Sequence, residues 1–194
     1  MITVSTSKIA ARAYHHGDLR SALVAAGLEA LKTTAIADMS LRQLARDVGV
    51  SATAVYRHFP DKQALMQALA SEGINQLGVF QKAAAESSAD QAGDFAATGR
   101  AYVRFALAHP ALFRLIFSQS EPVGQTIFGD NLAAQMLQDK AARVTGGDPE
   151  ETRRLMIQAW SVVHGLAMLI LDRQLPADDA LIDRVIDSAT LFPR

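Results

Sequence analysis

The chain has 194 residues, a formal net charge of −1 and no cysteine. The lack of cysteine excludes disulfides, thiolate chemistry and cysteine-ligated zinc, and it agrees with a cytoplasmic location. Apolar residues make up 49% of the chain and charged residues 20%, which is ordinary for one or two small globular domains with a real core. Ala and Leu dominate and the prolines stand at helix starts, so an all-α protein is expected.

Neither a leader peptide nor a membrane span is predicted. The first ten residues, MITVSTSKIA, lack the apolar segment of a signal peptide. The longest apolar run, residues 160–171, contains His164 and is too short to cross a bilayer. No membrane partner is therefore expected.

The charges are distributed unevenly. Residues 1–65 hold eight Lys or Arg against five Asp or Glu, whereas the remainder holds eleven against fifteen. A basic head on an acidic body indicates that any phosphate contact lies at the N-terminal end. Residues 1–13 are either an arm that follows a DNA groove or a frayed terminus. The pair His15–His16 cannot face one site from a helix, so contact with phosphate or solvent is favoured over a metal or catalytic site.

Residues 40–62, SLRQLARDVGVSATAVYRHFPDK, predict two short helices joined by a tight turn. In the first, apolar residues recur at i, i+3, i+4 and i+7, and Ser40 with Gln43 matches a capping box. Gly49 suits the turn because it adopts a positive φ without strain, and Ser51 can cap the second helix. This order is typical of a helix-turn-helix, whose second helix enters the DNA major groove. Any two amphipathic helices joined through Gly remain an alternative.

The periodicity predicts further helices on both sides of this pair. Before it lies a helix at about 17–33; after it come helices at about 62–85, 94–109, 111–118, 121–144, 149–172 and one opening at 176–179. Asp61 and Asp148 stand where N-caps are expected. The prediction is about nine helices, with a DNA-binding domain at 1–60 and a larger helical domain at 61–194.

The chain resembles the TetR family of transcriptional regulators. The resemblance rests on Leu-x-x-x-Ala-x-x-x-Gly-Val-Ser at 41–51 and Val-Tyr-Arg-His-Phe-Pro-Asp-Lys at 55–62. The segment at 14–20 is also similar to the start of some members, and Trp160-x-x-x-His164-Gly165 resembles the Trp-His-Gly type of C-terminal domain.

The resemblance implies a double-stranded DNA operator as partner and a set of DNA-contacting residues in the head. These residues are Arg42, Ser51, Ala52, Thr53, Tyr56, Arg57, His58 and Lys62. Ala52 and Ala54 carry no hydrogen-bond donor, so direct base readout by this helix is thin. Arg57 as a solvated charge, Tyr56 as a core-edge aromatic, and a regulator-like protein that has lost DNA binding are the alternatives.

The resemblance also implies a small, largely apolar effector and a homodimer. The residues predicted to bind the effector are Phe105, Phe113, Phe117, Phe128, Met136, Trp160, His164 and Met168; each is otherwise plain core. The predicted dimer interface draws on Leu155, Ala159, Val163, Leu166, Ile182, Val185 and Ile186, some of which must face the core of their own subunit. The expected function is a repressor released from a palindromic operator by the effector, with corepressor action left open. No nucleophile motif, phosphate loop or metal-spaced cluster indicates an enzyme or a cofactor.

Overall fold

The computed structural model describes residues 19–88, 91–118 and 128–187, which contain nine α-helices, one 3-10 helix at Ile36–Asp38 and no strand. The helices are α1 (Leu19–Ala30), α2 (Leu41–Val48), α3 (Ala52–His58), α4 (Lys62–Glu86), α5 (Gln91–Ala108), α6 (Pro110–Ser118), α7 (Leu132–Val144), α8 (Pro149–Leu171) and α9 (Asp179–Val185). The all-α prediction is confirmed. The predicted arm at 1–13, the segment at 14–18 and the helix start at 121–122 lie outside the described residues.

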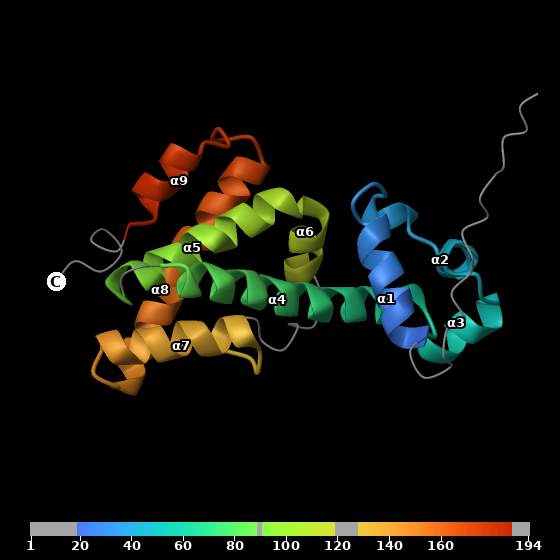
Figure 1. Ribbon diagram of the computed structural model, residues 1–194, viewed down its shortest axis with the longest axis horizontal. Helices are drawn as coiled ribbons and strands as arrows, with labels where there is room; N and C mark the ends of the chain where they lie inside the picture. Colours follow the sequence, from blue (N-terminus) through green and yellow to red (C-terminus); the bar gives the residue numbers. More distant parts are fainter. Residues whose placement is uncertain (1–18, 89–90, 119–127, 188–194) are drawn as a thin grey trace, which may run out of the picture.

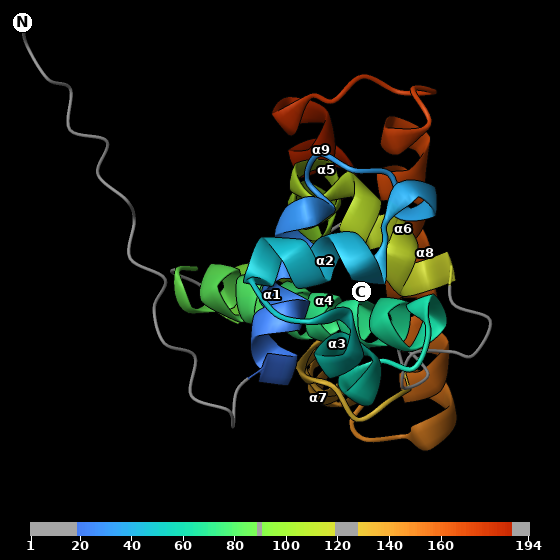
Figure 2. The same cartoon turned by 90° about the vertical axis from the view of Figure 1, so that its right-hand side faces the viewer.

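Helix α4 connects a small head to a larger body. Figure 1 shows α1, α2 and α3 packed together around one end of α4, α5, α6 and α7 along the rest of it, and α9 beyond α5; Figure 2 views the head end-on. In the head α4 packs against α1, and in the body it packs against α5, α6 and α7. One cluster of buried side chains runs from Leu23, Val55 and Phe59 in the head to Phe113 and Ile182 in the body. The head is therefore joined to the body by packed core.

The turn between α2 and α3 forms as the sequence predicts. Gly49 has φ 78°, in the left-handed region that favours glycine. The next N–H, of Val50, donates to the Ala45 carbonyl at 2.9 Å and so satisfies a carbonyl at the end of α2. Ser51 Oγ accepts the N–H of Ala54 at 3.2 Å, which caps α3.

The predicted capping box at the start of α2 is wrong. Ser40 has the extended backbone of an N-cap, but its side chain makes no cap hydrogen bond. Gln43 does not reach back to it, because its amide donates to Asp47 Oδ1 at 2.7 Å and its carbonyl oxygen accepts from Arg46. Partners one turn along the same helix have replaced the cap.

The helix predicted from residue 121 begins later than expected. Asn131 has φ −138° and ψ 157°, an extended conformation that no helix can pass through, and its side chain accepts the N–H of Ala134 at 2.9 Å. Helix α7 therefore starts at Leu132, and Phe128 lies before it. At α8 the predicted cap is confirmed, since Asp148 Oδ1 accepts the N–H of Glu151 at 2.8 Å.

Helix α8 extends beyond the apolar run that the sequence shows. By length and composition its 23 residues could cross a membrane. In the fold one face of α8 packs against α5 and α7, as the core helix of a helical domain does. The inward apolar residues of α8 thus form part of the core of the body.

Candidate DNA-binding head and effector cavity

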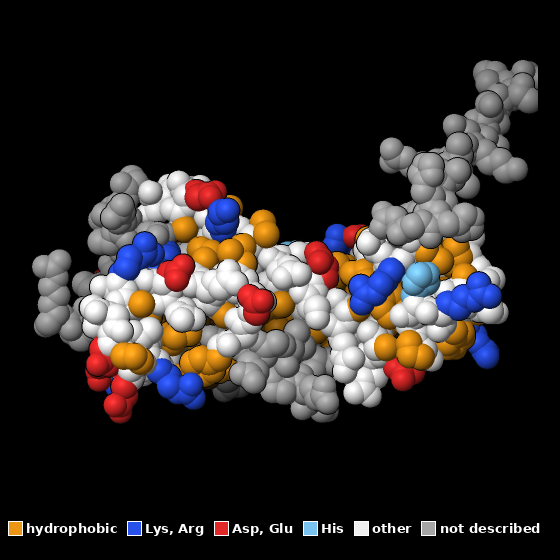
Figure 3. Space-filling model, turned by 90° about the horizontal axis from the view of Figure 1, so that it is seen from below, with side chains coloured by type: hydrophobic (Ala, Val, Ile, Leu, Met, Phe, Trp, Pro, Cys, Tyr) orange, Lys and Arg blue, Asp and Glu red, His pale blue; other side chains and the backbone are white. Residues whose placement is uncertain are grey.

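The outer surface of α2 and α3 is polar. Arg42, Thr53 and Arg57 are exposed, while the apolar residues of the two helices point inward. Tyr56 is 43% exposed, so it is a surface side chain and not a core-edge aromatic. Figure 3 shows Lys, Arg and His side chains gathered over the head. The arrangement offers donors and positive charge at a protruding helix, as a phosphate and base-edge contact requires.

Other residues predicted to contact DNA already have structural roles. Lys62 Nζ donates to the Ala37 carbonyl at 2.6 Å, which ties the start of α4 to the 3-10 helix before α2. The Ser51 hydroxyl caps α3. His58 is exposed and lines an open groove between α1 and α4, together with Arg20, whose guanidinium lies 5.3 Å from the centre of the Phe59 ring. Ala52 is half-buried, with no side-chain donor.

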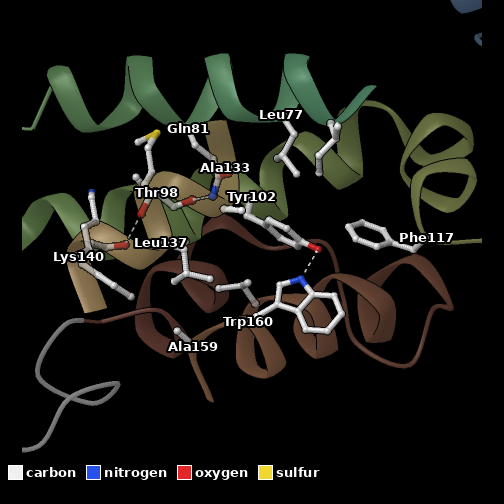
Figure 4. Close-up of a pocket in the computed structure, with 16 residues that line it drawn as sticks. Leu77, Gln81, Thr98, Tyr102, Phe117, Ala133, Leu137, Lys140, Ala159 and Trp160 are labelled. Atoms are coloured by element: carbon white, nitrogen blue, oxygen red, sulfur yellow. Dashed lines mark hydrogen bonds between the residues drawn. The ribbon is translucent and has the colours of Figure 1, made fainter. Parts of the chain in front are cut away.

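A partly open cavity of about 60 Å³ lies in the body between α4, α5, α6, α7 and α8 (Figure 4). One water needs about 10–15 Å³ on the same scale, so the cavity has room for a small molecule. Three residues predicted to bind an effector, Phe117, Met136 and Trp160, line it. The lining is mainly apolar; its polar members are Gln81, Thr98, Tyr102 and Lys140.

The other residues predicted to bind an effector lie outside this lining. Phe105 and Phe113 are buried in the core, and Met168 packs against it. His164 stands behind the cavity, with its ring 5.5 Å from that of Phe113. Phe128 is 40% exposed, and the Arg153 guanidinium lies 4.4 Å from its ring centre. Helical spacing shows which side chains point inward but not which part of a core is hollow.

A hydrogen-bonded chain links the cavity to His164. Trp160 Nε1 donates to Tyr102 Oη at 3.2 Å, and Tyr102 Oη lies 2.9 Å from His164 Nδ1. Burial raises the pKa of Tyr102 and lowers the pKa of His164, because the charged form of each loses solvation. The rings of Trp160 and His164 pack directly, with their centroids 4.9 Å apart, and Tyr102 also joins them through its hydroxyl, but only Trp160 lines the cavity.

The polar residues of the lining were missed as site residues, although the sequence carries a signal for them. Gln81 follows Leu77 by one turn on the inward face of α4, and Thr98 and Tyr102 are one turn apart on α5. A polar residue within an apolar stripe is buried only if something satisfies it. Polar residues that interrupt the apolar stripes of α4 and α5 could therefore have located the site from the sequence.

Most residues of the predicted dimer interface are buried within their own chain. The buried ones are Leu155, Ala159, Val163, Leu166, Ile182 and Ile186, whereas Val185 is 36% exposed. These residues are buried because α8 packs on α5 and α7 and because α9 packs on α5. The outward face of α8 instead carries Ile157 and Leu169, which are 42% and 46% exposed.

Both parts of the chain match models of one protein family. Residues 23–69 match the bacterial regulatory proteins of the tetR family, and residues 95–189 match the tetracyclin repressor-like C-terminal domain. These matches confirm the resemblance seen in the head and extend it over the body. The Trp-His-Gly subtype stays a prediction.

Solved structures share the fold over most of the chain. A protein of unknown function from Rhodococcus sp. RHA1 is 33% identical, with a TM-score of 0.71 over 93% of this chain and 96% of its own. A TetR-family transcriptional regulator from Streptomyces coelicolor is 19% identical, with a TM-score of 0.64 over 89% of this chain and 79% of its own. The multidrug binding protein EbrR, complexed with imidazole, is 20% identical, with a TM-score of 0.55 over 90% and 95%. No curated protein matches the chain significantly.

Proposed function

Because the chain belongs to the TetR family of bacterial transcriptional regulators, we propose that it is a cytoplasmic homodimeric repressor, released from a palindromic operator by a small, largely apolar effector. The observation that carries the proposal is the path of α4. Its first turns hold the head against α1, and its middle residues Ile74, Leu77 and Gln81 line the cavity. Any ligand that moves α4 therefore moves the head as well.

In the head, the proposal assigns readout to few side chains. Arg42 contacts a base or phosphate, Thr53 reaches a base edge, and Tyr56 and Arg57 contact the backbone; each of them is exposed. His58, at the end of α3, and Lys62, at the start of α4, position the head on the DNA. The rest of the specificity comes from DNA shape and from half-sites about one helical turn, or a multiple, apart.

In the body, the proposal assigns regulation to a population shift. An effector that prefers one spacing of the two heads stabilises that spacing and lowers operator affinity by the ratio of its affinities for the two states. The structural neighbour EbrR, a multidrug binding protein, supports a ligand-binding role for this fold.

The dimer is proposed to form through the outward face of α8 and through α9. Ile157, Ser161, Gly165 and Leu169 recur every four residues along this face, and a side-chain Cβ built at Gly165 would meet open space. Val185 of α9 adds exposed apolar surface. The pair Ile157→Glu and Leu169→Glu places charge on this face and should give a monomer by sedimentation velocity, whereas Val144→Glu, on α7, should leave the dimer intact. Persistence of the dimer in the double variant would contradict this interface.

Operator binding is tested by fluorescence anisotropy with DNA from upstream of the gene. Arg42→Ala should weaken binding by about 1–3 kcal/mol and relax specificity, and Tyr56→Ala should weaken binding uniformly across sequences. Arg153→Ala, an arginine of α8 at the far end of the molecule, is the matched control and should bind as the intact protein does. If the intact protein prefers its upstream DNA no more than unrelated DNA, the repressor proposal fails.

That failure would favour the alternative function, a ligand-binding protein that has kept the fold and lost sequence-specific DNA binding. The observation behind it is the absence of side-chain donors at Ala52 and Ala54 on α3. Ligand binding without operator binding would establish this alternative.

A further inference from the structure

A residue that lines the cavity carries a buried acceptor that the described residues leave unsatisfied. Gln81 Oε1 is inaccessible to solvent and has no hydrogen-bond partner in the described part of the chain. The orientation of its amide is fixed, because Gln81 Nε2 donates to the Thr98 carbonyl at 3.1 Å, and the flipped amide would set oxygen against oxygen. A buried polar atom without a partner is destabilising, so a native example calls for an explanation. Here the atom belongs to a residue that lines the ligand cavity.

The other polar groups of the lining are already engaged. The Thr98 hydroxyl donates to the Phe95 carbonyl at 2.8 Å, which leaves only its acceptor lone pairs. Tyr102 Oη has Trp160 on one side and His164 on the other. Lys140 already has an interaction of its own. The unmet requirement of the cavity is therefore one hydrogen-bond donor.

The charge of the lining narrows the ligand further. Among the described lining residues Lys140 is the only ionisable group with a positive charge, and none is acidic. An ammonium ion would sit beside Lys140 in a low-dielectric space without a carboxylate to pair with. A carboxylate would bring lone pairs against Gln81 Oε1 and could donate nothing to it. A neutral donor escapes both penalties.

Resting on the proposed function, we propose that the effector is a small neutral molecule with an apolar body and one hydroxyl group, which donates its proton to Gln81 Oε1. The apolar body packs against Phe117, Met136 and Trp160. Specificity of this kind is strong, because an analogue that lacks the donor leaves the buried oxygen unpaired.

Four six-membered-ring compounds test the proposal on the full chain. Cyclohexanol is neutral and donates, cyclohexanone has nearly the same shape and only accepts, cyclohexylamine is a cation, and cyclohexanecarboxylate is an anion. Trp160 is the chain's single tryptophan, so its fluorescence reports on occupancy of the cavity. Cyclohexanol should bind about tenfold more tightly than each of the other three, a difference of about 1.4 kcal/mol.

Two variants locate the effect. Gln81→Met keeps the length of the side chain but removes the acceptor, and should reduce the preference for cyclohexanol over cyclohexanone to about onefold. Gln76→Met, on the same helix but away from the cavity, should keep the tenfold preference. Equal or tighter binding of cyclohexanone, cyclohexylamine or cyclohexanecarboxylate by the intact protein overturns the proposal, as does an unchanged preference in Gln81→Met or no binding of cyclohexanol. Operator binding by the ligand-free protein is measured separately, so failure here does not count against the DNA-binding role.

Discussion

The head and the cavity handle polar side chains in opposite ways. In the head, Arg42, Tyr56 and Arg57 stand in solvent, and the apolar residues beneath them form the support. In the cavity, Tyr102 and Gln81 lie among apolar neighbours. The Tyr102 hydroxyl has specific hydrogen-bond partners, whereas Gln81 Oε1 has none among the described residues. An exposed polar group has water as a partner and is free to exchange it for DNA. A buried one fixes what the cavity can accept.

The two regions are nevertheless parts of one folded unit. The core cluster continues from Phe59 through Leu69 of α4 to Phe113, so the two sites share their mechanical support. This arrangement suits a protein in which occupancy of one site changes the other, since coupling travels through packed elements that have discrete arrangements.

The largest loss of stability is expected when a large side chain is removed from the shared core, in the head or in the body. Phe59 and Phe113 are fully buried, and Phe59→Ala or Phe113→Ala should each lower the free energy of unfolding by about 3–5 kcal/mol. Urea denaturation followed by circular dichroism should give one cooperative transition in both variants. Separate transitions for head and body in Phe59→Ala would show that the continuous core does not fold as a unit.

A smaller effect separates the two regions by function. Gly49 and Gly146 have φ values of 78° and 65°, and a Cβ at either would meet open space, so replacement by Ala strains only the backbone. Gly49→Ala and Gly146→Ala should each cost about 1–2 kcal/mol of stability. Only Gly49→Ala should also weaken operator binding, because its turn sets the angle between α2 and α3. Equal DNA affinities in the two variants would contradict this role for the turn.

A still smaller effect is expected at the contact between α5 and α9. Arg104 donates to Asp179 at 2.9 Å and to Asp183 at 3.0 Å. Burial by itself lowers the pKa of Arg104, but the hydrogen bonds and charges of the two carboxylates together outweigh it and raise the pKa. The pairs are largely exposed, so Arg104→Met should cost no more than about 1 kcal/mol, and less at high salt. Arg154→Met, which removes an exposed pair within α8, is the control and should not change the melting temperature measurably. A salt-independent loss in Arg104→Met would indicate packing in place of ion pairing.

The pH dependence of stability tests the buried hydrogen-bond chain. Burial lowers the pKa of His164 below its ordinary value of 6.5, so the unfolded chain takes up this proton more readily than the folded one. The contribution of neutral His164 is fully present above about pH 6.5 and is lost as the pH falls through the folded pKa. Between about pH 7 and about pH 5 the melting temperature should therefore fall less steeply in His164→Gln than in the intact protein. The Gln side chain can still accept a hydrogen bond from Tyr102. Parallel slopes in the two proteins would contradict a neutral, half-buried His164.

Much of the head could be predicted from the sequence because its signals are local. The turn at Gly49, the cap at Ser51 and the inward position of Val55 depend on residues within a few positions of one another. The capping box at Ser40 failed because Gln43 had closer partners on its own helix. Competition among equally local hydrogen bonds is not visible in a motif.

The body was predicted less well because its site is assembled from distant segments. Gln81, Tyr102, Lys140 and Trp160 come from four helices and meet only after folding. Periodicity identified the apolar faces of α8 and α9, but it could not tell which of their residues, such as Leu166 and Ile182, are buried within their own chain. An apolar face is the same in sequence whether a neighbouring helix or a second copy covers it.

The sequence by itself determined the helical class, the helix-turn-helix and the family, because caps, turns and i, i+3, i+4 spacing act over a few residues. The tertiary structure alone decided where the core is hollow, which residues line that cavity, and that Gln81 Oε1 has no hydrogen-bond partner among the described residues. A cavity is the space that neighbouring packed helices fail to fill, so it exists only once all of those helices are in place.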